Sequence, residues 1–393
     1  MLDNDLLMTP GPTEIPPRVL KAMARSSMVP YHPEFIEILD RTLDKLEKVY
    51  QTANEVVVMP GSGRIGLESA LTSVIEDGDR VLSIVAGFFG GWIKDIAGAL
   101  GGRAEEFSVG WGQPVDLNRL EDALKKGDYN LLTLVHNETS AGSTYPAGEI
   151  ARLAHRYGAL VLMDTISSLG GVDIPTDDWE VDLNVSTTHK CISAPIGLAF
   201  VAVGPRAWEK MESRKTPCKS FFLNLLKWKT AIVPAPGQEG KTVKQRRQAV
   251  FMPVHSIFAL SEALDIIIEE GFEPRFNRHI LNAVAFRDGI RAIGLKVLAE
   301  EDVASPTVTC VLLPEGVSAP EVIVALREKH HIRVGGGIAD LKERAIRLGH
   351  MGLTSSPQYI IPALSGIEKT LSSMGCRLPK GEAIRRAQEL LSG

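Results

Sequence analysis

The feature that most constrains the fold is a series of short segments that are apolar at nearly every position. They cover residues 56–59, 81–85, 131–135, 160–163, 183–186 and 198–203. A strand with one face in water alternates apolar and polar residues, so continuous apolar runs predict strands buried on both faces. Helical spacing of apolar residues occurs at 34–49, before the first run, and at 147–157, between two of the runs. This order predicts an α/β fold in which helices flank a mostly parallel, mixed sheet.

The remainder of the chain predicts a second, smaller unit. A strong helical pattern at 254–270 ends at Gly271, a glycine in the C-cap position. The segments after it, in order, predict a helix at 275–293, strands at 307–313 and 332–334, and helices at 357–375 and 380–391. We therefore expect a large domain at 18–271 and a small α+β domain at 272–393.

Two other stretches lack a regular pattern. The opening segment holds prolines at positions 10, 12, 16 and 17, which exclude a central strand or a helix interior. We expect residues 1–17 to form an extended N-terminal arm. Residues 234–247 are polar and basic and predict a surface excursion or an interface loop.

Composition excludes several classes of protein. The net charge is −5, which gives no overall attraction to nucleic acid or to an anionic membrane. The apolar runs are far shorter than a membrane span, and acids near the N-terminus do not fit a secretory signal. Four cysteines cannot form a disulfide scaffold, and the adjacent His330 and His331 lack the spacing of metal ligands. We expect a soluble, cytoplasmic protein without a bound metal.

The first candidate site is the sequence Gly-Ser-Gly-Arg-Ile-Gly at 61–66, between an apolar run and a helical pattern. It matches G-x-G-x-x-G, a loop that can hold a phosphate at a helix N-terminus. A dinucleotide site also needs an acid at the end of the next strand, but Asp79 precedes that strand. We keep the phosphate site and discard the dinucleotide, with a turn that merely requires glycine as the alternative.

The second candidate site combines Asp164 and Lys190. Asp164 ends the apolar run 160–163, where an unpaired buried carboxylate is costly and needs a cation or a capping role. Lys190 follows the run 183–186, and a lysine in an apolar site has a lowered pKa and can form a Schiff base. An acid and a lysine at neighbouring strand ends suit pyridoxal phosphate, whose aldehyde binds the lysine and whose ring nitrogen pairs with the acid. A helix cap and a surface lysine are the plainer alternatives.

These residues belong to a longer set of landmarks that resembles a known family. The landmarks lie at 8–13, 61–64, 89–90, 136–142, 164 with 168–171, 187–190, 306–309 and 347–352. Together they resemble the class V aminotransferases of fold type I, in the alanine–glyoxylate, serine–pyruvate and ureidoglycine–glyoxylate branch. The resemblance implies pyridoxal phosphate as cofactor, a homodimer, and transamination between alanine or serine and glyoxylate or pyruvate.

The resemblance also implies a role for each matching residue. Lys190 would hold the cofactor covalently and later carry the proton, and Asp164 would pair with its ring nitrogen. Phe89 would stack on the ring, and Thr139 would contact the ring oxygen. The residues implied to surround the phosphate are Ser62, Gly63, Arg64, Thr187 and His189. Arg347 would bind the substrate carboxylate with both arms of its guanidinium group.

Two departures from the family pattern concern the phosphate. Gln248 and Phe251 stand where the family often places a Tyr and a Thr that reach the neighbouring subunit's cofactor. Either Gln248 or one of the basic residues Arg246 and Arg247 replaces them, or the dimer contact differs. In having an arginine at position 64, the chain resembles the ureidoglycine–glyoxylate aminotransferases. Their reaction is therefore an alternative activity.

A cysteine desulfurase-like lyase is a further alternative. Residues 187–190 resemble the lysine motif S-x-H-K of those enzymes, which also need a nucleophilic cysteine on a mobile loop. Cys310 lies in a β-branched pattern that predicts a strand, where a structural thiol is expected. The other three cysteines, at 191, 218 and 376, have no better setting.

Overall fold

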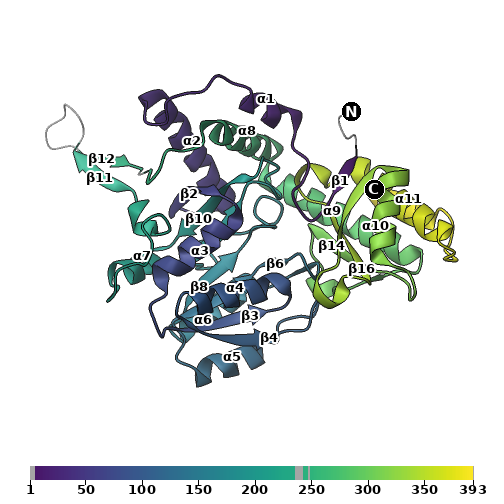
Figure 1. The fold of residues 1–393 in the computed structure, drawn as a ribbon, viewed down its shortest axis with the longest axis horizontal. Helices are drawn as coiled ribbons and strands as arrows, with labels where there is room; N and C mark the ends of the chain where they lie inside the picture. Colours follow the sequence, from purple (N-terminus) through teal and green to yellow (C-terminus); the bar gives the residue numbers. More distant parts are fainter. Residues whose placement is uncertain (1–4, 235–241, 247, 393) are drawn as a thin grey trace.

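The computed structural model describes residues 5–234, 242–246 and 248–392 (Figure 1). Its central element is a seven-stranded sheet in which β10 runs antiparallel to both of its neighbours and the other pairs are parallel. The strands, in spatial order, are β2 (Glu55–Gly61), β10 (Gly197–Val203), β9 (Leu183–Thr187), β8 (Leu160–Asp164), β5 (Leu131–Val135), β3 (Arg80–Val85) and β4 (Arg103–Ser108). The predicted α/β class and all six predicted apolar strands are confirmed. The sequence missed β4, an edge strand in which three of the six residues are charged and four are exposed.

Helices pack around this sheet. They are α1 (Pro17–Met23), α2 (Pro33–Tyr50), α3 (Gly63–Val74), α4 (Phe88–Ala99), α5 (Leu117–Lys126), α6 (Ala147–Arg156), α7 (Pro205–Glu212) and α8 (Val254–Glu270). Helix α8 lies against α1 and α2, far away in sequence (Figure 1), and Lys45 of α2 forms an ion pair of 2.6 Å with Asp265 of α8. Helix α3 packs closely on the sheet because Gly66 has no side chain: a Cβ there would lie 2.8 Å from Val185.

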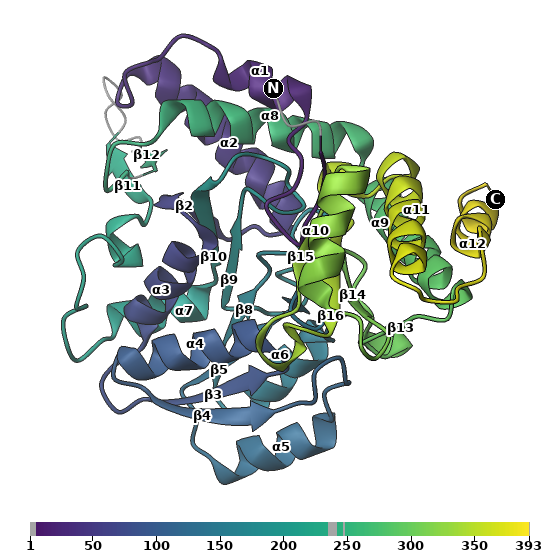
Figure 2. The same cartoon turned by 45° about the vertical axis from the view of Figure 1, so that its right-hand side comes forward.

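A second sheet of five strands lies beside the first. Its strands, in spatial order, are β1 (Leu6–Met8), β15 (Ile332–Gly336), β16 (Ala345–Gly349), β14 (Val308–Leu312) and β13 (Lys296–Val297). The helices with it are α9 (Phe272–Ala292), α10 (Ala319–His330), α11 (Pro357–Ser373) and α12 (Glu382–Leu391), gathered at one side of the molecule in Figure 2. Gly271 joins α8 to α9 with a φ of 84°, a conformation that favours glycine.

The buried apolar side chains form two main clusters. One contains residues between Val19 and Ile267, and the other contains Met8 and residues between Ala285 and Ala387. The clusters support the proposed division at 18–271 and 272–393, whose boundaries stay a prediction. Met8 joins the second cluster because β1 pairs with β15, so the arm connects the two sheets.

Smaller elements complete the chain. The excursion proposed at 234–247 lies partly outside the described residues; its described parts belong to the hairpin of β11 (Ala231–Pro234) and β12 (Thr242–Gln245). A short hairpin of β6 (Asn137–Glu138) and β7 (Ser143–Thr144) follows β5, and 3₁₀ turns lie at Leu225–Lys227, Glu301–Val303, Ala339–Leu341 and Gly352–Thr354. Among the described residues, none of the helices has the length and apolar character needed to span a membrane.

Candidate active site

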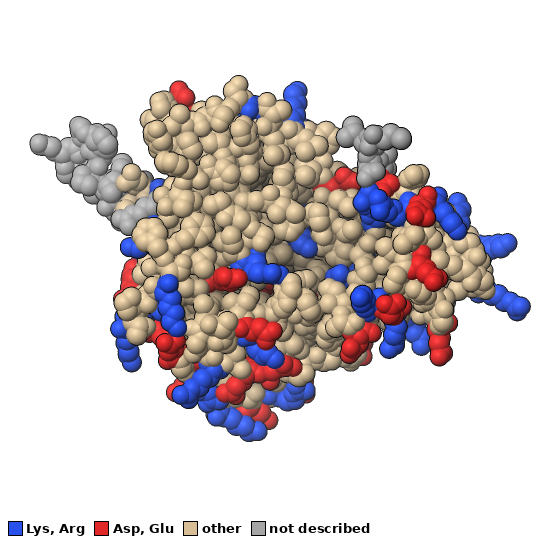
Figure 3. All heavy atoms as spheres, in the orientation of Figure 1, with Lys and Arg blue, Asp and Glu red and all other residues tan. Residues whose placement is uncertain are grey.

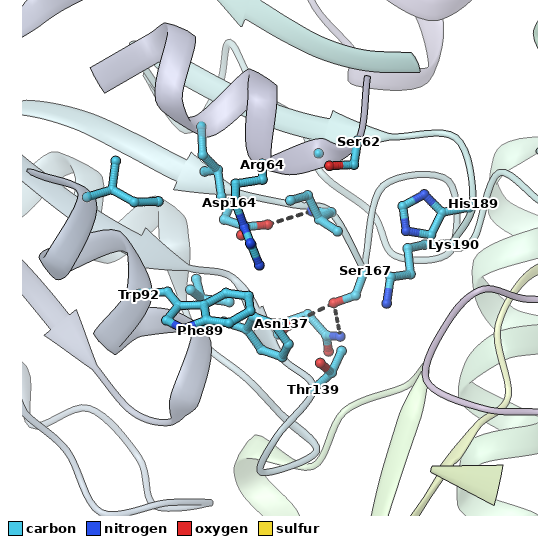
Figure 4. Close-up of a pocket in the computed structure, with 15 residues that line it drawn as sticks. Ser62, Arg64, Phe89, Trp92, Asn137, Thr139, Asp164, Ser167, His189 and Lys190 are labelled. Atoms are coloured by element: carbon cyan, nitrogen blue, oxygen red, sulfur yellow. Dashed lines mark hydrogen bonds between the residues drawn. The ribbon is translucent and has the colours of Figure 1, made fainter. Parts of the chain in front are cut away.

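A cavity of about 310 Å³ opens at the carboxyl ends of β5 and β8, beside the N-terminus of α3 (Figure 4). The predicted site residues that line it are Ser62, Gly63, Arg64, Phe89, Thr139, Asp164, His189 and Lys190. Ligands of open α/β sheets bind at such strand ends. The fold therefore brings segments from over a hundred residues of sequence to one site.

One end of the cavity is the first turn of α3. The helix begins at Gly63, within the glycine-rich loop at 61–66, and its N-cap Ser62 makes no side-chain capping hydrogen bond. Backbone amides at a helix start can bind an anion. A Cβ at Gly63 would lie 2.5 Å from Cδ1 of Ile166, so glycine lets this turn approach the loop after β8. Thr187 lies behind the cavity: its hydroxyl donates to the carbonyl of Leu198 at 2.8 Å. Its role at a phosphate stays a prediction.

Asp164 is the last residue of β8 and is buried. Its Oδ1 accepts a hydrogen bond from the Ile166 amide at 2.8 Å, and no basic side chain of the described residues forms an ion pair with it. Burial raises the pKa of Asp164 to about 7, and the nearby charge of Glu138 adds to the rise. A cation placed beside this carboxylate would stabilise its charged form.

Lys190 follows β9 and faces the same cavity (Figure 4). Burial lowers the pKa of Lys190 to about 8, and the positive charge of Arg347 lowers it further. Its Nζ donates to the carbonyl of Pro10, so the N-terminal arm covers the lysine. A Cβ at Gly11 would lie 2.2 Å from this Nζ, and the φ of +124° at Gly11 also requires glycine. Beside the lysine, burial lowers the pKa of His189 to about 4, which keeps this imidazole neutral.

An aromatic wall forms the opposite side of the cavity. Phe89 and Trp92 lie one turn apart on α4, with ring centroids 5.4 Å apart. The guanidinium carbon of Arg64 lies 3.8 Å from the centroid of the Trp92 ring, a cation–π contact. Sequence reasoning missed Trp92, although its i+3 spacing from Phe89 places both on one helix face.

Residues of the loop after β5 also line the cavity. Asn137, which the sequence analysis did not single out individually, donates from Nδ2 to the hydroxyls of Ser167 at 2.7 Å and Thr307 at 3.0 Å. These bonds tie the loop to the one after β8 and to the start of β14. Thr139 is thereby held at the cavity.

Arg347 approaches from the second sheet. It lies on β16, and its Nε donates to the Gly336 carbonyl at 2.7 Å while Nη1 donates to the Thr139 carbonyl at 3.1 Å. It is not itself among the residues that line the cavity, but it contacts one that is. No carboxylate of the described residues forms an ion pair with it, and burial lowers the pKa of Arg347. Among the described residues, none forms a hydrogen bond with Nη2, which leaves that edge of the guanidinium group for a ligand.

Comparison with known proteins places this chain in a family. The chain matches the family model for class-V aminotransferases over residues 6–341. It is 35% identical to an uncharacterised aminotransferase of Methanocaldococcus jannaschii, covering 98% of this chain and 97% of the relative. It is 31% identical to the pyridoxamine–pyruvate transaminase of Mesorhizobium japonicum, covering 98% and 96%.

Solved structures agree with this assignment. The ureidoglycine–glyoxylate aminotransferase of Bacillus subtilis superposes with a TM-score of 0.92 at 28% identity, covering 99% of this chain and 98% of that one. An alanine–glyoxylate aminotransferase from Nostoc sp. gives a TM-score of 0.87 at 32% identity, covering 94% and 96%. The chain belongs to the class-V aminotransferases and is a pyridoxal-phosphate-dependent enzyme of fold type I.

The residues at the site fit this cofactor. The uncapped first turn of α3 suits the phosphate, Phe89 offers a ring to stack on, and the unpaired Asp164 suits a protonated ring nitrogen. Lys190, with its lowered pKa, suits the aldehyde. Within the described ranges, His, Cys, Asp and Glu form no group of three that could hold a metal ion.

Proposed function

We propose that this enzyme transfers the amino group of a small amino acid, alanine or serine, to glyoxylate or pyruvate. The observation that carries the proposal is the setting of Arg347. Its guanidinium group is oriented by two backbone carbonyls and has no ion-pair partner among the described residues. A planar, permanently charged group with a free edge suits the carboxylate that all four substrates share.

The size of the cavity supports small substrates. Ligand sites span roughly 300–1,000 Å³, and about 310 Å³ lies at the lower end of that range. The cofactor and the substrate share this space, so little room remains beyond the carboxylate and a short side chain. Orientation of the substrate then depends mainly on Arg347.

The chain's own residues supply the remaining functions. When bound, pyridoxal phosphate supplies the aldehyde that takes the amino group and the ring that stabilises negative charge at the substrate Cα. Lys190, whose pKa is about 8, has a neutral amine available near neutral pH and can accept and return the Cα proton. Asp164 holds a positive charge on the ring nitrogen, and Phe89 fixes the plane of the ring.

The alternatives differ in their support. Ureidoglycine–glyoxylate transamination is the second candidate, because the structure that superposes with a TM-score of 0.92 is the ureidoglycine–glyoxylate aminotransferase of Bacillus subtilis. A desulfurase-like lyase has less support, because Cys310 is buried on β14 and burial raises the pKa of its thiol to about 12. Burial raises the pKa of the Cys191 thiol equally, to about 12.

A donor–acceptor matrix tests the proposal. The purified enzyme is mixed with each of alanine, serine, ureidoglycine, pyridoxamine and cysteine, and the absorbance of the bound cofactor is followed before and after addition of glyoxylate or pyruvate. We expect the absorbance to change with alanine or serine and to recover with the oxo acid. A change with ureidoglycine alone would replace the proposed donor, and a change with none of these amines would refute the proposal.

We also propose that the enzyme is a cytoplasmic homodimer. The upper face in Figure 3, over α1, α2 and α8, carries few charged side chains, unlike the lower face. Exposed apolar residues belong to this region: Leu20 is 51%, Tyr31 69% and Phe251 76% exposed, and the rings of Tyr31 and Phe251 are 5.8 Å apart. Such a patch suits a protein interface. Light scattering at assay concentration tests it, and a monomeric active enzyme would refute it.

A second question at this face is which residue reaches the phosphate of the neighbouring subunit's cofactor. Arg246 is occupied within its own chain, where it binds Asp44 at 2.8 Å and Glu47 at 3.0 Å. This leaves Gln248 as the described candidate to reach a neighbouring cofactor, and Arg247 lies outside the described residues. All four cysteines are free, which suits the reducing cytoplasm.

A further inference from the structure

Glu138 is a fully buried carboxylate next to the active site that has no role in the reaction outlined above. It lies in β6, on the loop between β5 and Thr139. Its Oε2 accepts hydrogen bonds from the amides of Phe89 at 3.0 Å and Gly90 at 3.1 Å. Its Oε1 accepts from the amide of Ser140 at 3.0 Å and from the Ser140 hydroxyl at 2.5 Å.

Burial raises the pKa of Glu138, but all four of these partners are donors, so both of its oxygens act as acceptors and the hydrogen bonds favour the ionised carboxylate. Two of the donors, the amides of Phe89 and Gly90, belong to the first turn of α4. The N-cap residue of this helix, Gly87, makes no side-chain capping bond. Glu138 therefore caps α4 from a distant segment of the chain, with a charge of the sign that a helix N-terminus favours. The hydroxyl of Ser140 completes the cap by accepting from the Phe88 amide at 2.9 Å.

The two segments that Glu138 joins both contribute residues that line the cavity. Helix α4 carries Phe89, the ring proposed to stack on the cofactor. The turn that begins at Glu138 contains Thr139, whose carbonyl orients Arg347 at 3.1 Å. We propose that Glu138 is a positioning residue that holds the Phe89 ring and the Arg347 guanidinium group in fixed relation to each other at the pocket. The part concerning Arg347 rests on its proposed function in binding the substrate carboxylate.

Two observations support this arrangement. A Cβ at Gly87 would lie 2.4 Å from both Cγ of Glu138 and the Ser140 hydroxyl, so the first turn of α4 and the Glu138 turn are packed without spare room. The charge of Glu138 is also close enough to raise the pKa of Asp164 and to offset the effect of burial on Arg347.

The test substitution is Glu138→Gln. This substitution keeps the size of the side chain but replaces one oxygen with an NH₂ group. The NH₂ group cannot accept a hydrogen bond, and it would face either the two amides of α4 or the amide and hydroxyl of Ser140. We expect the dissociation constant of pyridoxal phosphate for the apoenzyme, measured from its induced visible circular dichroism, to rise at least tenfold. We also expect the KM of the amino donor to rise at least fivefold.

A matched control is Glu76→Gln. Glu76 likewise accepts three donors, the amides of Lys215 and Thr216 and the Thr216 hydroxyl, at 2.8–2.9 Å, but it is not among the residues of the cavity. We expect this control to lower the melting temperature without changing cofactor affinity or KM.

Gly87→Ala is the second test, because it leaves the charge of Glu138 intact and displaces it by contact alone. The φ of Gly87 is 169°, extended backbone that alanine adopts, so any effect comes from the contact. We expect the same paired changes in cofactor affinity and KM, and this variant decides the matter if Glu138→Gln does not fold. Wild-type cofactor affinity in both variants, or a change in only one of the two quantities, overturns the proposal. The cofactor measurement uses no substrate, so it stands even if alanine and serine prove to be the wrong donors.

Discussion

The pocket has two walls that are held in place by different interactions. The wall from the seven-stranded sheet carries Asp164, His189 and Lys190 at or just after the ends of buried strands, and burial shifts the pKa of each one. The second wall comes from the five-stranded sheet and carries Arg347, which does not line the cavity itself but contacts the lining residue Thr139 and is oriented by backbone carbonyls. The difference matches the tasks: proton transfer needs a group whose pKa lies near the working pH, whereas carboxylate binding needs a charge that survives burial.

The N-terminal arm lies between the two walls. The carbonyl of Pro10 accepts from Lys190, while the Thr13 hydroxyl donates to the Met351 carbonyl at 3.0 Å, just beyond β16. A Cβ at Gly349 would lie 2.2 Å from the Thr9 carbonyl oxygen, so the arm is also tightly packed against β16. We therefore expect a variant of Lys190 in the first wall to lose covalent cofactor binding, and variants of the second wall to keep it.

The largest effect should follow from Lys190→Ala. Without the amine, no covalent bond to the cofactor can form, and we expect transamination to fall by roughly 10³-fold or more. Borohydride reduction followed by mass spectrometry measures the covalent cofactor, with the exposed Lys125→Ala as the control. Stoichiometric labelling of the Lys190→Ala protein would show that another lysine performs this role.

Arg347→Lys should have the next largest effect. Lysine keeps the charge but loses the two-armed geometry, and we expect kcat/KM for the amino donor to fall about 100-fold, equivalent to about 3 kcal/mol. Cofactor binding should remain intact, which distinguishes this wall from the first. Arg344→Lys, an exposed position just before β16, serves as the control. An unchanged KM for both amino acid and oxo acid would remove Arg347 from the substrate site.

The pH dependence of cofactor capture should reflect the lowered pKa of Lys190. The neutral amine attacks the aldehyde, so the rate at which apoenzyme binds the cofactor covalently should rise about tenfold per pH unit below pH 8 and level off above it. Between pH 8 and 10.5 the unfolded chain binds more protons at this group, so its contribution to stability rises with pH there. Stopped-flow absorbance measures the rate. A rise that continues unchanged to pH 10 would show an ordinary lysine.

Gly349→Ala should have the smallest effect. It tests whether the N-terminal arm, which packs against β16, also keeps Lys190 buried. The new methyl group would press on the Thr9 carbonyl and displace the arm, at a cost of about 1–3 kcal/mol in the free energy of unfolding. We also expect a severalfold rise in KM and a capture midpoint above pH 8, because Lys190 would become better hydrated. Urea unfolding and the capture assay measure these quantities. Gly98→Ala, where a Cβ would meet open space, is the control. An unchanged midpoint would mean that the arm does not bury Lys190.

Local sequence pattern determined the first wall. Apolar runs predict buried strands, and polar residues that follow such runs lie near strand ends, so the sequence predicted Asp164 and Lys190 near a common ligand. The glycine-rich turn at 61–66 likewise predicts a helix start, which the structure places at Gly63. These inferences hold because strand alternation, helix periodicity and glycine conformations all depend on neighbours within a few residues.

Only the tertiary structure decided how the two walls meet. The bond from Arg347 to the Thr139 carbonyl joins residues 208 positions apart, and the cover of Lys190 by Pro10 spans 180 positions. Glu138 caps a helix that begins fifty residues earlier, where the local sequence offers only a glycine. No local pattern encodes such pairs, because each depends on the register of two sheets and on the packing of the arm between them. The sequence by itself determined which chemical groups stand at the strand ends, and the fold determined which of them meet.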